Sequence, residues 1–115
     1  MKYAILEVGG KELKLKLGTQ EIIEIEKKLG GKSLLKILME EQLLPLETAL
    51  SILHASLKKF EHGYTIQKVY ELYDEYVDEE GSFTDLTAKL LEVLQVSGFF
   101  SKEQVEKAKE QATAE

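Results

Sequence analysis

The sequence contains no cysteine, no arginine and no tryptophan, and it has one proline and two histidines. The lack of cysteine excludes disulfides, thiolate catalysis and cysteine-ligated zinc. All 15 basic residues are lysines, and 21 acidic residues bring the net charge to −6. Nucleic-acid recognition relies heavily on guanidinium contacts to phosphates and base edges, so an acidic chain without arginine is a poor candidate for it. We therefore expect no nucleic-acid partner.

Long apolar runs are also missing. No stretch approaches the roughly 20 apolar residues that span a bilayer, and the N-terminus lacks the apolar core of a signal peptide. We therefore expect synthesis in the cytosol and no membrane partner. Hydrophobic residues still make up 43% of the 115 positions, which is enough apolar material for a single core. The sequence predicts one globular domain over residues 1–100, followed by a weakly packed helical tail over residues 101–115.

Residues 3–17 alternate between apolar and polar side chains, as β-strands do. Gly9 and Gly10 interrupt this alternation and suit a two-residue hairpin turn. Such a turn predicts the following pairs across the strands: Ala4 with Leu15, Ile5 with Lys14, Leu6 with Leu13, and Tyr3 with Lys16. The sequence therefore predicts a hairpin with one apolar face and with Tyr3 and Ile5 on a lysine-rich face.

From residue 19 onward the apolar period changes to that of helices. Polar residues that favour N-caps precede each apolar stripe except the third, which follows Pro45; they are Thr19, Ser33, Thr65 and Ser82. Glycines are placed to end the helices at residues 30–31, 63, 81 and 98. We predict a mainly α (α+β) fold, in which the N-terminal two-stranded hairpin is followed by a bundle of about five short helices.

The last segment, from residue 101 to 115, has a weak apolar stripe of one valine and two alanines, at Val105, Ala108 and Ala112. Burying so little apolar area yields little free energy at about 25 cal/mol per Å². We therefore expect this tail to pack weakly or to order against a partner.

No arrangement of residues in the sequence predicts catalysis or a bound cofactor. His54 and His62 are eight residues apart and lack the carboxylates of a metal-site motif. The acidic segment DEEGSFTD does not fit a calcium loop, because Tyr76 and Thr87 would stand at positions one and twelve. The glycines of VGGKELK lie in the predicted hairpin turn and do not form a phosphate-binding loop. We expect a chain that is not an enzyme and binds no metal or cofactor.

Features typical of protein binding are better represented. The hairpin needs helices or another strand to pack against, and its edge is a candidate for self-association into a homo-oligomer. The tyrosines of the fourth predicted helix form either core or interface, where tyrosine is enriched. The phenylalanines after Gly98 form either core or an exposed apolar edge. The candidate protein-binding residues are Tyr3, Ile5, Tyr73, Tyr76, Phe99 and Phe100.

Three segments of the chain, taken in order, resemble a known family. They are VGGKELKLKLGTQEIIEIEKKLGGKSLLKIL, ALSILHASLKKFEHGYTIQKVYELYDEYVDEEGS and LLEVLQVSGFF. Together they resemble the tail assembly chaperones of long-tailed, siphovirus-type phages and prophages of Gram-positive bacteria. The resemblance spans roughly residues 3 to 100, and its most specific parts are ILHASLKKFEHG and YELYDEYVDEEGS.

The resemblance implies a non-enzymatic chaperone that binds the tape measure protein while the tail tube assembles around it. It implies the tape measure protein as a partner and the tail tube protein as a second candidate partner. It also implies a location in the cytoplasm of the bacterial host and absence from the mature virion. The residues leave another class open, namely a small cytosolic adaptor or regulatory domain that binds a basic helix through the acidic face of the fourth predicted helix.

Overall fold

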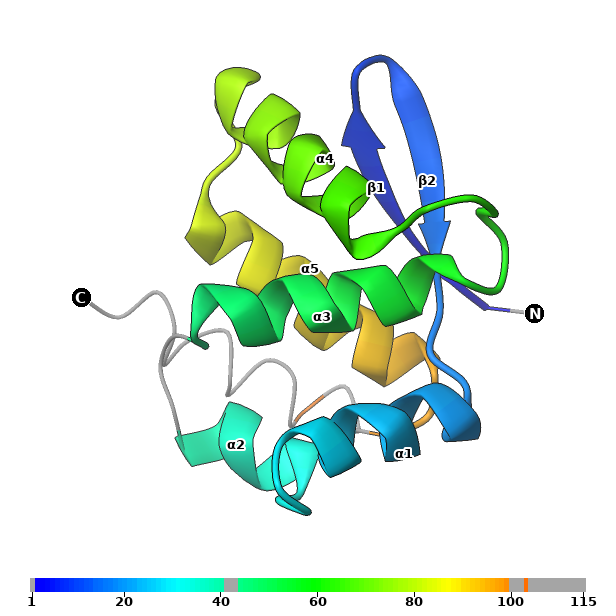
Figure 1. The fold of residues 1–115 in the computed structure, drawn as a ribbon, viewed down its shortest axis with the longest axis vertical. Helices are drawn as coiled ribbons and strands as arrows, with labels where there is room; N and C mark the ends of the chain where they lie inside the picture. Colours follow the sequence, from blue (N-terminus) through cyan, green and yellow to red (C-terminus); the bar gives the residue numbers. More distant parts are fainter. Residues whose placement is uncertain (1, 41–43, 100–102, 104–115) are drawn as a thin grey trace.

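A computed structural model describes residues 2–40, 44–99 and 103 of the chain (Figure 1). The predicted N-terminal hairpin and five helices are confirmed. The elements are β1 (Ala4–Val8), β2 (Lys11–Leu15), α1 (Thr19–Lys28), α2 (Leu34–Glu40), α3 (Leu46–Leu57), α4 (Ile66–Asp78) and α5 (Phe83–Val96). Phe100 and, apart from Glu103, the predicted tail over residues 101–115 lie outside the described residues.

The hairpin has the predicted antiparallel register, with Ala4 opposite Leu15 and Leu6 opposite Leu13. Gly9 and Gly10 have φ angles of 61° and 74°, the left-handed conformation that a tight type I′ turn requires at both central positions. The turn therefore sets the register, and the register places alternate apolar side chains on one buried face. That face consists of Ala4, Leu6, Val8, Leu13 and Leu15.

The buried face of the hairpin packs against the helices, because a two-stranded hairpin cannot bury its apolar side chains alone. β1 contacts α4 and α5, and β2 contacts α3. Figure 1 shows α3 crossing the middle of the molecule, with α4 and the hairpin on one side of it and α1 and α2 on the other. The centre of the core is formed by fully buried side chains of α3 and α5, namely Ile52, Leu53, Leu57, Leu86, Leu90, Leu91, Val93 and Leu94.

Three of the predicted helix caps are present in the structure. The hydroxyl of Ser33, just before α2, accepts a hydrogen bond from the Lys36 amide at 3.3 Å. The hydroxyl of Thr65 accepts a hydrogen bond from the Lys68 amide at 3.1 Å, and the hydroxyl of Ser82 accepts one from the Asp85 amide at 3.1 Å. The prediction that Thr19 caps α1 is wrong. Gly18 is the N-cap, and its amide donates to the Glu21 carboxylate at 3.1 Å. A carboxylate three residues after the N-cap is the other half of a capping box, and here it acts without a hydroxyl partner.

The third helix ends at Leu57, before the position Gly63 that the sequence suggested. The residues beyond it turn toward the hairpin instead of continuing the helix. The Phe60 ring packs edge-on against the Tyr3 ring with centroids 5.6 Å apart. The Glu61 carboxylate accepts a hydrogen bond from the Lys14 amide at 3.1 Å. The helix thus ends earlier than its apolar periodicity indicates, and the residues after it contact a distant segment of the chain. None of the helices within the described residues is both long and apolar enough to cross a membrane.

Candidate protein-binding surfaces

The residues predicted to bind partners lie in three separate places. Tyr3 and Ile5 are on the outer face of the hairpin, Tyr73 and Tyr76 are on α4, and Phe99 follows the end of α5. Phe100 lies outside the described residues. The structure therefore does not gather these residues into one surface, and each place has its own chemistry.

On the hairpin, Tyr3 and Ile5 are partly exposed on the face opposite the core. The Lys14 ammonium lies 5.0 Å from the centroid of the Tyr3 ring and 5.8 Å from that of Phe60, both within cation–π range. Tyr3 therefore contacts both an aromatic ring and a lysine side chain. This surface is small and mixed in character.

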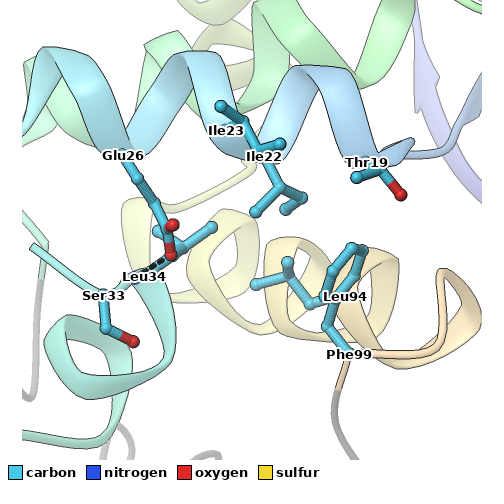
Figure 2. A pocket seen from close by; sticks show the side chains of 8 residues that line it. All are labelled: Thr19, Ile22, Ile23, Glu26, Ser33, Leu34, Leu94 and Phe99. Atoms are coloured by element: carbon cyan, nitrogen blue, oxygen red, sulfur yellow. Dashed lines mark hydrogen bonds between the residues drawn. The ribbon is translucent and has the colours of Figure 1, made fainter. Parts of the chain in front are cut away.

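Phe99 lines an open cavity of about 350 Å³ between α1, the start of α2 and the end of α5 (Figure 2). We call this cavity the Phe99 groove. Its walls are mostly apolar, and it is open to solvent. The lining residues are Thr19, Ile22, Ile23, Glu26, Ser33, Leu34, Leu94 and Phe99.

The position of Phe99 follows from the way α5 ends. Gly98 adopts a φ of 87°, the Gly98 amide donates to the Gln95 carbonyl, and the Phe99 amide donates to the Leu94 carbonyl, each at 3.0 Å. This is the Schellman pattern, which brings the residue after the glycine back toward the last turn of the helix. Figure 2 shows the Phe99 ring beside Leu94, as the apolar residue after Gly98 was expected to lie.

A partly buried hydrogen bond holds the opposite wall of the groove together. The Glu26 carboxylate of α1 accepts the Leu34 amide at 2.8 Å, which fixes the start of α2 against α1 (Figure 2). Leu34 and Ile22 are buried at the base of the groove. Ile23 and Phe99 stand at its rim with 47% and 40% of their surface exposed, so the groove presents apolar side chains to a partner. Sequence reasoning missed Ile23, although an isoleucine off the buried stripe of a helix was a visible signal.

A second groove lies between α3 and α4, and we call it the Tyr73 groove. It has a volume of about 370 Å³, and its lining residues are Leu46, Glu47, Leu50, Tyr70, Tyr73 and Asp74. Leu46 is 48% exposed, and Tyr70, one of the tyrosines that the sequence left open between core and interface, is 40% exposed. The first turn of α3 and the middle of α4 leave this space unfilled, so side chains on nominally apolar stripes face solvent here.

Tyr76 lies deeper in the protein than its predicted binding role suggests. Its ring packs against the core and against Gly81, where an added Cβ would come within 2.5 Å of the ring. Burial is the main cause that raises the pKa of Tyr76 above its ordinary value, and the nearby Asp85 carboxylate and Tyr73 add to the rise. The centroids of the Tyr73 and Tyr76 rings are 6.4 Å apart. Tyr73 lines the groove, and Tyr76 is its aromatic neighbour.

One carboxylate of the acidic segment at the end of α4 makes a hydrogen bond within the protein. Both Glu79 carboxylate oxygens lie 3.0 Å from the Gly9 amide, so the end of α4 holds the tip of the hairpin. Glu71, Asp74 and Asp78 remain exposed. Sequence reasoning treated the whole run as a solvated surface, because the hairpin turn is 70 residues away in the chain.

The two histidines differ in burial and in hydrogen bonding. His54 is partly buried on α3, and its Nε2 lies 2.9 Å from the Tyr64 carbonyl, whereas His62 is exposed beyond the helix. Burial raises the pKa of Tyr64 above its ordinary value, with further contributions from Glu61 and Glu75. Within the ranges 2–40 and 44–99, no three histidine, aspartate or glutamate side chains are grouped so that they would hold a metal ion.

Of three comparisons with known proteins, one gives a match. No curated protein and no solved structure matches it. Residues 2–115 match the model of DUF6096, a family of unknown function, and the chain therefore belongs to this family.

Proposed function

We propose that this protein is a non-enzymatic tail assembly chaperone that binds the tape measure protein while the phage tail tube assembles. It would act in the cytoplasm of the bacterial host, with the tail tube protein as a second partner, and would be absent from the mature virion. The proposal rests on the three segments that resemble tail assembly chaperones. The Phe99 groove is the structural observation that supports it best.

The Phe99 groove suits a helical client. An amphipathic helix binds by laying an apolar face into an apolar groove, and tape measure proteins are long helical chains in the family that this sequence resembles. Ile23 and Phe99 offer exposed apolar contacts on opposite walls, and Ile22 and Leu34 form a preformed base between them. A client helix that covers these side chains would be shielded from aggregation until the tube encloses it.

Co-expression with the tape measure protein from the same locus tests this proposal. The wild-type chain should keep the tape measure protein soluble and be recovered with it in a pull-down. Ile23→Ser and Phe99→Ser should each lower that recovery at least about fivefold, as for side chains that anchor an interface. Val77→Ser is the matched control, because Val77 is 45% exposed but lies on α4, outside the groove.

Two results would refute the proposal. One is a tape measure protein that stays insoluble and unbound in the presence of the wild-type chain. The other is equal loss of recovery in Val77→Ser and in the groove variants, with all variants folded by circular dichroism, because that pattern would remove any special role of the Phe99 groove.

A second candidate is a small adaptor or regulatory domain that binds a basic helix through α4. The observation that favours it is the exposed acidic surface of Glu71, Asp74 and Asp78. Binding through this surface should weaken as salt rises, because exposed charges are screened. Neutralising Glu71, Asp74, Glu75 and Asp78 together should abolish it, and a complex that is insensitive to both changes would exclude this candidate.

A further inference from the structure

The Tyr73 groove combines an apolar floor with exposed aromatic and aliphatic walls. Leu50 is buried at its base, and Leu46 and Tyr70 stand on opposite sides with nearly half of their surfaces open to solvent. Tyr73 also lines the groove, and its ring centroid lies 6.4 Å from that of Tyr76. Tyrosine beside a preformed apolar pocket is the composition of interface hot spots. This groove is separate from the Phe99 groove and shares no lining residue with it.

The charge around the Tyr73 groove has one sign. Glu47 of α3 and Asp74 of α4 both line it and are exposed, and no lysine lines it among the residues that the structure describes. Asp78 follows Asp74 one turn further along α4 and is exposed as well. α3 contains no lysine from Leu46 to Leu57. If an apolar side chain of a partner enters this groove, the adjacent residues of the partner come close to carboxylates on both walls. Lysine or arginine at those adjacent positions would complement the carboxylates in charge.

We propose that the Tyr73 groove binds an amphipathic helix of another protein that carries lysine or arginine beside its apolar stripe. Apolar side chains one turn apart enter between Leu46 and Tyr70, and the flanking cations lie against Glu47 and Asp74. The inference deepens the adaptor candidate, since it names the groove and the chemistry of the partner. It does not depend on the tape measure proposal, which concerns the Phe99 groove.

Fluorescence anisotropy with a labelled model helix tests the inference. The probe is an amphipathic peptide made only of leucine and lysine, and its control has glutamate in place of each lysine. The wild-type chain should bind the lysine peptide with an affinity that falls as salt rises, and it should not bind the glutamate peptide. Leu46→Ser, Tyr70→Ser and Asp74→Asn should each weaken binding about tenfold.

The matched controls are Val77→Ser and Glu40→Gln. Val77 is 45% exposed, nearly the same as Leu46, and does not line the Tyr73 groove, and Glu40 is an exposed carboxylate on α2. Both controls should leave the affinity for the lysine peptide unchanged. Ring resonances of Tyr70 and Tyr73 in NMR spectra of the wild-type chain should shift on titration with the peptide, which tests the site without any substitution.

Several outcomes would overturn the inference. They are binding that Val77→Ser weakens as much as Leu46→Ser, peptide contacts that leave the tyrosine resonances in place, and a wild-type oligomer that Leu46→Ser dissociates, since a second copy would then fill the groove. If neutralising the acidic face abolishes binding but Leu46→Ser and Tyr70→Ser do not weaken it, the adaptor candidate stands and the groove is wrong. If Ile23→Ser and Phe99→Ser both lose the tape measure protein, the chaperone proposal stands whether or not the lysine peptide binds.

Discussion

At the scale of single residues, the end of α4 has the tightest constraints. Glu80 has a φ of 70°, a left-handed conformation that costs a non-glycine residue about 1–2 kcal/mol. The Gly81 amide donates to the Tyr76 carbonyl at 2.9 Å, and this bond brings Gly81 under the Tyr76 ring. The glycine is therefore needed for the close approach of the ring, and a glutamate occupies the position where the backbone favours glycine.

These two neighbours should respond oppositely to substitution. Gly81→Ala should lower the free energy of unfolding by about 1–3 kcal/mol, because the new methyl group overlaps the Tyr76 ring. Glu80→Gly should raise it by about 0.5–1 kcal/mol by relieving the left-handed strain, less the greater chain entropy of glycine. Urea unfolding measures both. If Gly81→Ala costs as much in a Tyr76→Leu background, the ring is not the cause.

At the scale of elements, one carboxylate connects segments that are far apart in sequence. Glu79, at the C-terminal end of α4, accepts the Gly9 amide at the hairpin tip. The apolar face of the hairpin packs against the helices, and its turn lies at the same end of the molecule as the end of α4 (Figure 1). The link to Glu79 therefore joins the hairpin turn to the end of α4.

Removing this link should loosen the turn without unfolding the protein. Glu79→Ala should speed hydrogen exchange of the Gly9 amide at least about tenfold, and should lower the free energy of unfolding by only about 0.5 kcal/mol because the bond is exposed. Asp78→Ala, which removes a neighbouring exposed carboxylate, is the control. Equal exchange rates in both variants would show that Glu79 does not hold the turn.

At the scale of the whole molecule, the two edges of the hairpin differ. On β2, the Lys14 amide donates to Glu61 and the Lys16 amide donates to the Ser56 carbonyl at 3.0 Å. On β1, no residue that the structure describes accepts a hydrogen bond from the Ile5 amide. Contacts with the end of α3 and the loop after it thus occupy one edge, and β1 is the edge left for pairing with a second chain.

If the chain forms the homo-oligomer expected from its sequence, β1 should carry the contact. Light scattering of the purified protein should then give a mass that rises with concentration, and Ile5→Lys should shift the population toward monomer, because charge on an edge strand opposes pairing. Lys11→Glu alters charge near the turn and serves as a control. A strict monomer at all concentrations would contradict the expectation.

The sequence by itself determined the elements and much of their local geometry. Alternation around Gly9 and Gly10 fixed the hairpin and its register, because the turn type and the two-residue period act within a few residues. The caps of α4 and α5 at Thr65 and Ser82 followed from equally local hydrogen bonds. The error at Thr19 arose because a carboxylate at Glu21 supplied the bond that a hydroxyl was expected to make.

Only the tertiary structure decided where the binding surfaces lie. The Phe99 groove joins residues from Thr19 to Phe99, and the Tyr73 groove opens where α3 and α4 leave Leu46 and Tyr70 uncovered. Periodicity shows which side of a helix is apolar, but not which part of that side a neighbouring helix will cover. That coverage depends on how the helices cross, which is set by the packing of the whole core.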